Sequence, residues 1–251
     1  MMKTVEDWHT RFVQQAQWTE SIRQYIFNQV GFNHANILIE IGCGTGALLN
    51  EISASGLIHG LDIDLERLNF AKAHNSLSMF TCGDAHRLPY SNNIFDLIFC
   101  HFLLLWVAHP EQTIDEMIRV GKPGSAILIL AEPDYGGRID FPESLQPLGQ
   151  AQGESLQTQG ADPRTGRKLA GWLTKAGLED IQTGVIGGQW RGQPSKKEWE
   201  KEWQVLTSDL GSVIPKEKMG EYKQIDKEAW ESGSRVLFVP TFYGFGRVPK
   251  L

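Results

Sequence analysis

The most constraining feature of the sequence is an apolar run that ends in closely spaced glycines. Residues 37–41 read Ile-Leu-Ile-Glu-Ile, and Gly42, Gly44 and Gly46 follow at every second position. Such a run is typical of a buried strand, while glycine permits a turn with positive φ and a close approach of ligand to backbone. Residues 47–55 favour a helix, whose first amides would face that ligand. The segment therefore predicts a nucleotide-binding corner.

Strand-like and helix-like segments alternate along most of the chain. The predicted strands cover residues 37–41, 57–61, 78–81, 95–100, 125–131, 178–186 and 235–241. The predicted helices between them cover residues 47–55, 65–74, 110–120 and 169–176. A helix over residues 4–30 precedes the first strand, and a polar, helical insertion precedes the last. Apolar strands separated by helices indicate an α/β fold with a parallel sheet that is covered on both faces.

Composition limits the class of partner. The chain has 251 residues, of which 41% are hydrophobic, enough for one large α/β domain. Its net charge of −6 argues against nucleic acid as the main partner, because phosphate binding needs a basic footprint. The longest apolar run, residues 97–108, is too short to cross a bilayer, and the polar residues 1–17 do not resemble a signal peptide. We therefore expect a cytoplasmic protein without a membrane partner.

The cysteines indicate neither a disulfide framework nor a metal site. There are three, Cys43, Cys82 and Cys100, each inside an apolar or motif segment. An odd number without paired spacing predicts free thiols in a reducing compartment. We expect these thiols to be buried and no metal to be bound.

Three acidic residues narrow the choice of ligand. Glu40 lies within the first predicted strand, where a carboxylate is costly unless a cationic ligand or a ring of backbone donors compensates it. Asp62 ends the second predicted strand, 20 residues after Gly42, and could accept hydrogen bonds from both hydroxyls of a ribose. Asp84 follows Gly83 after the third strand, and could accept a hydrogen bond from the exocyclic amine of an adenine.

Glu40 and Asp84 also have ordinary structural explanations. Glu40 could point outward at the end of its strand, and Asp84 could be a turn residue. For Asp64, two residues after Asp62, capping the next helix is the better explanation.

Together these residues resemble the class I S-adenosylmethionine-dependent methyltransferases. The family's first motif, Glu-x-Gly-x-Gly-x-Gly, is matched in full at residues 40–46, and its ribose and adenine acids are matched at Asp62 and Asp84. Residues 95–100 match the fourth-strand motif, and residues 119–125 resemble the Lys-Pro-Gly element before the fifth strand. The chain is most similar to the small-molecule group of methyltransferase types 11 and 25. It lacks the Asp/Asn-Pro-Pro element of DNA amino-methyltransferases after the fourth strand.

The resemblance, close over residues 37–132, implies the fold and its boundaries. It implies a doubly wound, Rossmann-like, mostly parallel seven-stranded sheet whose last strand, residues 235–241, runs antiparallel. A single methyltransferase domain would span residues 1–251. Its parts would be an N-terminal helical segment (1–34), a cofactor-binding core (35–132) and acceptor-side lid segments (133–168 and 187–234).

The resemblance also implies S-adenosyl-L-methionine as cofactor, S-adenosyl-L-homocysteine as product and a set of cofactor-binding residues. These residues are Glu40, Gly42, Cys43, Gly44, Gly46, Asp62, Ile63, Asp84, Ala85 and His101. Glu40 would face the methionine end, the backbone of 42–44 would line the cofactor, and Ile63 and Ala85 would flank the adenine. Methyl transfer would be an in-line displacement that depends mainly on positioning.

The acceptor side is less constrained. His101 is a candidate general base near the sulfonium, although a packed histidine that bonds to its surroundings is the simpler interpretation. Tyr135, a second candidate catalytic residue, and Arg138 follow the fifth strand at the edge where open α/β sheets bind ligands. Both are candidate acceptor-binding residues. Trp199 and Trp203, spaced i, i+4 on one helix face, could cap an aromatic acceptor, but core packing of the insertion against the main domain is the commoner use of such a pair.

Four functions remain open, and a methyltransferase acting on a small-molecule acceptor is favoured. Ala47 completes a dinucleotide-binding pattern with the glycines, which suggests a nicotinamide-dependent oxidoreductase. Such a site needs neither Glu40 nor the Gly83-Asp84 pair. Aminopropyl transfer would need an acidic pocket, and the sequence shows no clear acidic cluster. A non-catalytic protein that binds S-adenosylmethionine remains the fourth option, and the oligomeric state is open.

Overall fold

The computed structural model describes residues 4–52, 56–187 and 194–250, and these form two compact units. The first, called here the sheet unit, is drawn from residues 2–132, 165–186 and 241–251. The second, the helical unit, is drawn from residues 133–164 and 187–240. The predicted roles of the segments 133–168 and 187–234 as lids, and the single-domain boundaries, remain predictions.

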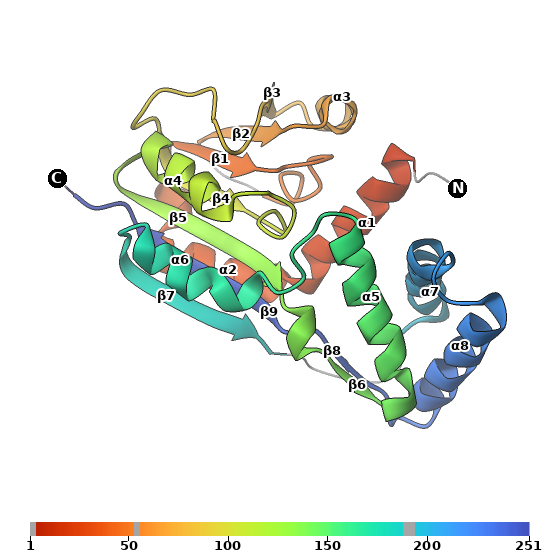
Figure 1. Ribbon diagram of the computed structural model, residues 1–251. Coiled ribbons are helices and arrows are strands. Elements are labelled where there is room, and N and C mark those ends of the chain that lie inside the picture. The colour runs from red at the N-terminus through yellow and green to blue at the C-terminus, as the bar shows by residue number, and fades with distance from the viewer. Residues whose placement is uncertain (1–3, 53–55, 188–193, 251) are drawn as a thin grey trace. The chain divides into compact units, whose positions relative to one another are not determined.

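The sheet unit contains a seven-stranded sheet (Figure 1). Its strand order is β3 (Ser78–Cys82), β2 (Leu57–Asp62), β1 (Ile37–Ile41), β4 (Phe95–Cys100), β5 (Gly121–Pro133), β9 (Thr241–Arg247) and β7 (Glu179–Ile186). The first five strands pair in parallel, and β7 pairs antiparallel to β9. The chain passes outward from β1 to β3 and then returns to β4, so the strand order reverses between β1 and β4. The predicted fold class is confirmed.

Helices cover both faces of this sheet (Figure 1). They are α1 (Val5–Trp18), α2 (Glu20–Val30), α3 (Leu65–His74), α4 (Pro110–Val120) and α6 (Leu169–Lys175), with short 3-10 turns η1 (Phe32–His34) and η4 (Gly166–Lys168). Side chains of α4 and α6 share a buried cluster with Ile39 and Ile41, and those of α2 and α3 share another with Leu38. Because alternate strand residues point to opposite faces, β1 is apolar on both sides.

The helical unit has its own core. It contains α5 (Gln146–Thr158), α7 (Lys196–Leu210), α8 (Lys216–Glu231), the 3-10 turns η2 (Tyr135–Gly137) and η3 (Glu143–Leu145), and a two-stranded antiparallel sheet of β6 (Ile139–Phe141) and β8 (Val236–Phe238). Its buried apolar residues are Leu145, Leu148, Trp203, Leu210, Ile214, Met219 and Tyr222.

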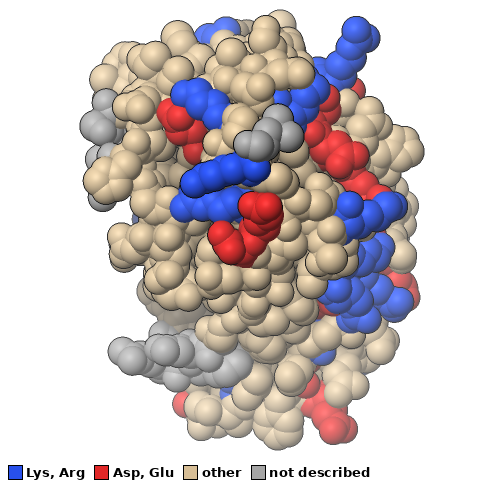
Figure 2. Space-filling view, turned by 90° about the vertical axis from the view of Figure 1, so that its left-hand side faces the viewer, with Lys and Arg blue, Asp and Glu red and all other residues tan. Residues whose placement is uncertain are grey.

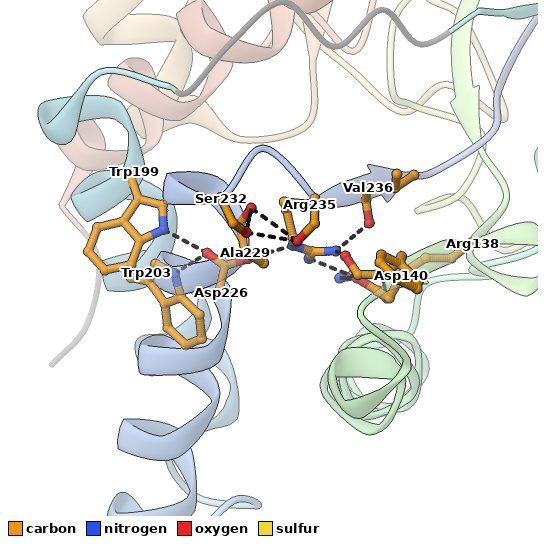
Figure 3. A network of polar contacts seen from close by, with 11 residues as sticks. Arg138, Asp140, Trp199, Trp203, Asp226, Ala229, Ser232, Arg235 and Val236 are labelled. Atoms are coloured by element: carbon orange, nitrogen blue, oxygen red, sulfur yellow. Dashed lines mark hydrogen bonds and ion pairs between the residues drawn. The ribbon is translucent and has the colours of Figure 1, made fainter.

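A buried chain of charges joins distant segments of the helical unit (Figure 3). Arg235 donates from Nε to Asp226 Oδ1 over 2.6 Å and from Nη2 to Asp140 Oδ1 over 2.9 Å. Asp140 in turn accepts from Arg138 Nε at 2.6 Å. These side chains are almost fully buried, so each charge depends on its partners for solvation.

Trp199 and Trp203 belong to the same network. Their indole Nε1 atoms donate to Asp226 Oδ2 over 2.6 Å and 2.9 Å (Figure 3), and Trp203 is buried in the core of the helical unit. The pair thus packs within the helical unit, and its packing against the main domain remains a prediction.

Three predicted elements differ clearly from the structure, and β5 begins four residues earlier and ends two residues later than predicted. The single helix over 4–30 is two helices, because the chain breaks at Thr19, whose buried hydroxyl bonds back to Ala16 O at 3.1 Å. The helix predicted over 47–55 is wrong for residues 47–51, which form turns, and residues 53–55 lie outside the described residues. There Glu51 N bonds to Leu48 O, an i−3 bond that tightens the chain.

The last strand of the large sheet was predicted six residues too early along the chain. Residues 236–238 form β8 of the small sheet, and β9 begins at Thr241, after Pro240. Arg235 is held in the buried charge network, which ties β8 to the helical unit. Gly244 and Gly246 make β9 difficult to recognise in the sequence, because glycine is depleted in strands.

Charged side chains of both signs lie beside one another on the face of the molecule shown in Figure 2. Across the described ranges, the helices are all too short or too polar to cross a membrane.

Removing Arg235 is expected to destabilise the protein. Arg235→Met leaves two buried aspartates short of a cation, and losing one partner of such a network costs about 3–5 kcal/mol. Lys227→Met, which removes an exposed partner of Glu231 on α8, is the control and should cost no more than about 1 kcal/mol. Urea unfolding followed by tryptophan fluorescence measures both, and equal losses would contradict a stabilising role for the network.

Candidate functional site

The predicted ligand site lies in the sheet unit, at the carboxyl ends of β1, β2 and β4, where the strand order reverses. Ligands of open α/β sheets bind at this place. The three glycines after β1 all have positive φ, 75° at Gly42, 52° at Gly44 and 72° at Gly46. Gly42 N also donates to Leu61 O at 2.7 Å, which fastens the loop to β2. A side chain at any of these positions would strain the loop.

Other elements enclose the glycine loop closely. A Cβ added to Gly42 would lie 2.6 Å from Leu103 Cδ1, and one added to Gly44 would lie 2.9 Å from Phe12 Cε2 of α1. At Gly46 it would meet Ala71 Cβ of α3 at 3.2 Å. Gly46 therefore does permit close packing of a helix, and that helix is α3. His9 Nδ1 lies 2.9 Å from Thr45 Oγ1, which adds a polar contact between α1 and the loop.

Glu40 is a buried carboxylate with an unfilled hydrogen-bonding position. Its residue is 3% exposed, and among the described residues its Oε2 has no hydrogen-bond partner. Burial raises the pKa of Glu40 to about 8; the charge of Asp62 adds to this rise and that of Arg23 opposes it. The alternative in which Glu40 points into solvent is wrong. A bound cation or a hydrogen-bond donor would compensate the orphaned oxygen.

Asp62 holds the glycine loop in place. It is buried, and its Oδ2 accepts from Gly44 N at 2.6 Å while Oδ1 accepts from Asp64 N at 2.9 Å. Because each carboxylate oxygen has two lone pairs, both remain able to accept from a ligand hydroxyl. Asp64 caps α3 by accepting from Glu66 N and Arg67 N, as predicted.

Asp84 is exposed and is held by one neighbour. Its Oδ1 accepts from His86 N at 2.9 Å and from His86 Nδ1 at 2.7 Å, and these bonds lower the pKa of Asp84. Since His86 Nε2 accepts from His109 N at 3.2 Å, the imidazole proton lies on Nδ1. Nearby in sequence, Ile63 is 71% exposed whereas Ala85 is buried. An ionised carboxylate and an exposed apolar side chain are thus available for the predicted adenine.

His101 is bound to the N-terminal helices. Its Nε2 lies 2.8 Å from Thr19 Oγ1, which also accepts from Arg23 Nη1 at 2.7 Å. Burial, and then the charge of Arg23, lower the pKa of His101 to about 3. Its ring therefore stays neutral at physiological pH and is a weak base, which favours the packed interpretation over the catalytic one.

Sequence reasoning did not identify Arg23 as part of this cluster. Arg23 Nη2 pairs with Glu51 Oε2 at 2.6 Å, and Nη1 also donates to Ala16 O. The sequence does contain a signal that Arg23 is buried. Arg23 precedes Ile26 by three residues and Val30 by seven, so it lies on the apolar face of the helix, where a solvated arginine would not lie.

Glu132 was also missed. It ends the apolar run of β5, is fully buried, and accepts from the backbone N–H groups of Leu103, Leu104 and Leu105. Burial raises the pKa of Glu132 to about 8, although these hydrogen bonds act to lower it. The signal resembled that of Glu40: a carboxylate inside or at the end of an apolar strand.

The two predicted acceptor-side residues belong to the helical unit. Tyr135 N donates to Pro163 O at 2.8 Å. The Arg138 guanidinium is 6% exposed and bonds to Asp140 and to Gln152 Oε1. These contacts already use much of its donor capacity. The catalytic role of Tyr135 and the acceptor-binding roles of both residues remain predictions.

The cysteines are free, but not all are buried. Cys43 and Cys100 are buried as predicted, whereas Cys82 is exposed at the end of the edge strand β3, so the expectation is wrong there. Within the described part of the chain, no group of three or more His, Cys, Asp or Glu residues could hold a metal ion.

A cavity of about 430 Å³ in the sheet unit lies away from these residues. Gln29, Asp180 and Arg247 are among its lining residues, and no predicted site residue lines it. The candidate site is therefore recognised by its chemistry rather than by cavity volume.

Comparisons with known proteins match part of the chain to a methyltransferase domain and to methyltransferases. Residues 39–129 match the type 11 family model described as "Methyltransferase domain". Over 47% of its length the chain is 30% identical to a demethylmenaquinone methyltransferase of Renibacterium salmoninarum, of which the match covers 51%. Over 37% of its length it is 35% identical to the biotin biosynthesis bifunctional protein BioHC of Cellvibrio japonicus, of which 19% is covered.

A solved structure shows the same fold. Phosphoethanolamine N-methyltransferase 2 of Haemonchus contortus, in complex with S-adenosyl-L-methionine, superposes with a TM-score of 0.55 at 13% identity. The match covers 86% of this chain and 49% of that one. The chain thus spans about half the length, or less, of these relatives.

Ionisation of Glu40 predicts a pH effect on stability. Between its ordinary value of 4.5 and about 8, the folded protein holds a proton that the unfolded chain releases. The free energy of unfolding of the ligand-free protein should therefore fall as the pH rises, by up to about 1.4 kcal/mol per pH unit from this group.

Glu40→Gln cannot ionise and should flatten this decline in urea titrations between about pH 5 and pH 8. Glu132, whose pKa is also raised, likewise makes the free energy of unfolding fall as the pH rises, and this contribution remains in Glu40→Gln. Glu66→Gln, an exposed glutamate on α3, serves as control. An unchanged slope in Glu40→Gln would show that Glu40 is already ionised.

Proposed function

We propose that this chain, which belongs to the class I S-adenosylmethionine-dependent methyltransferases, transfers a methyl group to a small-molecule acceptor. The predictions of the family and of its cofactor, S-adenosyl-L-methionine, are confirmed by the family match over residues 39–129. The observation that carries the proposal for this site is the orphaned, buried Oε2 of Glu40 beside three glycines with positive φ. A cationic ligand would compensate that oxygen.

The residues at the strand ends fit the cofactor. Glu40 offers a carboxylate to its cationic methionine end, and Asp62 offers two oxygens that are already oriented by Gly44 N and Asp64 N. Asp84 offers an ionised carboxylate to the adenine amine. The backbone of Gly42, Cys43 and Gly44, with Gly46, Ile63 and Ala85, completes the predicted cofactor site.

The chain contributes mainly position and the exclusion of water. The cofactor, when bound, supplies an already activated methyl group. Phe12 and Leu103 flank the glycine loop with apolar side chains, and exclusion of water favours a transition state in which charge is dispersed. His101 stays neutral, so it does not repel a cationic ligand. A base is required only for a protonated or weak nucleophile, and Tyr135 remains the candidate for that role.

The acceptor is proposed to be small. Among the relatives, one is named for demethylmenaquinone and another for biotin biosynthesis, which supports a metabolite rather than nucleic acid. The negative net charge points the same way. We place the reaction in the cytoplasm, with acceptor-binding residues supplied by the segments 133–168 and 187–234.

No observation on the described residues favours the alternative functions over methyl transfer. A dinucleotide has an anionic pyrophosphate, which a buried carboxylate at Glu40 would disfavour when ionised. A binding protein without catalysis would keep every cofactor contact. Transfer of label from methyl-labelled S-adenosylmethionine into a metabolite extract distinguishes these functions. Labelled product supports a methyltransferase, whereas cofactor binding without any labelled product favours the binding protein, and NADH binding alone favours an oxidoreductase.

Asp84→Ala is expected to weaken cofactor binding with little effect on the fold. The lost hydrogen bond involves a charged group, so the dissociation constant should rise by the equivalent of about 1–3 kcal/mol. Isothermal titration calorimetry with S-adenosylmethionine measures this change. Asp115→Ala, at an exposed aspartate of α4, is the matched control and should bind like the wild type. Equal affinities for both variants would remove Asp84 from the site.

Asp62→Ala should weaken binding at least as much, but for two reasons. It removes the ribose acceptor and also releases Gly44 N and Asp64 N from the carboxylate oxygens that accept from them. Comparing calorimetry with the urea midpoint separates the two effects, since Asp84→Ala should leave the midpoint unchanged and Asp62→Ala should lower it. Unchanged affinity in Asp62→Ala would contradict the assignment.

A further inference from the structure

Glu132 accepts hydrogen bonds from three backbone amides of the loop after β4. Its Oε1 accepts from Leu103 N at 3.0 Å and Leu104 N at 2.7 Å, and its Oε2 accepts from Leu105 N at 3.1 Å. Phe102 N donates to the preceding residue, Ala131 O, at 2.9 Å. Four successive amides are thus bound by two residues at the end of β5.

This anchoring stabilises an unusual backbone. Phe102 has a φ of 51°, a left-handed conformation that a bulky residue adopts only when its surroundings hold it there. The three amides that follow donate to the same buried carboxyl group, and leaving any of these buried donors without an acceptor would cost free energy. Glu132 therefore determines the course of residues 102–105.

The loop carries two groups of the candidate site. Leu103 fills the space on the Cβ side of Gly42, at 2.6 Å from an added Cβ, and so forms one wall of the glycine loop. His101 stands at the beginning of the loop, with its Nε2 beside Thr19 Oγ1. A shift of the loop would move the wall and change the position of the imidazole.

We infer that Glu132 is a positioning residue of the cofactor site: it holds the loop after β4 so that Leu103 and His101 stand correctly against the glycine loop. It acts through the backbone and need not touch the ligand. The expected effect on cofactor affinity rests on the proposed function. The positioning of the loop can be measured without any cofactor.

Glu132→Gln tests the inference with minimal change of shape. Glutamine keeps one acceptor oxygen and replaces the other by a donating amide nitrogen, which cannot accept from all three amides. We expect large shifts of the backbone amide signals of residues 103–105 in ¹H–¹⁵N spectra, and accompanying shifts at Gly42 and in the His101 ring. We also expect the dissociation constant for S-adenosylmethionine to rise about tenfold.

Glu116→Gln is the matched control. Glu116 on α4 also accepts from a loop amide, Leu88 N at 2.7 Å, and its side chain is partly buried whereas Glu132 is fully buried. Its variant should lose stability without moving the signals of Gly42 and His101 or the affinity for cofactor. If Glu132→Gln behaves in the same way, Glu132 is only structural and the inference is wrong.

The wild-type protein provides a second test that does not depend on a folded variant. Scalar couplings across the hydrogen bonds, from the amide nitrogens of 103–105 to the carboxyl carbon of Glu132, should be detectable. Their absence would overturn the inference. If the couplings and shifts are present but no S-adenosylmethionine binds even the wild type, the positioning role stands and the proposed function fails.

Discussion

The site depends on the cost of burying carboxylates in a sheet that is apolar on both faces. Helices cover both sides of β1, so Glu40 has no polar surface toward which it can turn. Glu132 meets the same constraint at the end of β5 and satisfies it internally, with three backbone amides. Glu40 retains an oxygen without a partner among the described residues. Glu132 is thus satisfied by the protein's own backbone, whereas Glu40 leaves one oxygen for a ligand. This contrast is the physical argument for a ligand beside Glu40.

The N-terminal helices complete the site as much as the sheet does. Phe12 covers Gly44, His9 contacts Thr45, and Thr19 contacts His101. Arg23 lies within reach of Glu51 and influences the ionisation of Glu40. The predicted cofactor-binding core, residues 35–132, therefore owes part of its electrostatic environment to α1 and α2, which lie outside the motifs that carry the family resemblance.

The sequence predicted what depends on local pattern. The bounds of β1, β4, α3 and α4 were predicted to the residue, because each is an uninterrupted apolar or amphipathic run with clear ends. The last strand was misplaced because glycines weaken the signal of β9. The partners of His101 and Glu132 could not be predicted, since contacts between residues far apart in sequence depend on how the helices and loops pack.

One consequence concerns the engineering of altered nucleoside preference. Asp62 is both a scaffold element and a prospective ligand contact, because its oxygens hold the amides of Gly44 and Asp64. Any redesign of the ribose contact would therefore have to rebuild the loop. Asp84, by contrast, is exposed and held chiefly by His86. The proposed contact to the base would therefore be easier to redesign than the proposed contact to the ribose. In the proposed site, recognition of a modified base would be changed through Asp84 and His86 while the scaffold stays intact, whereas the ribose contact could not be changed without altering the fold of the loop.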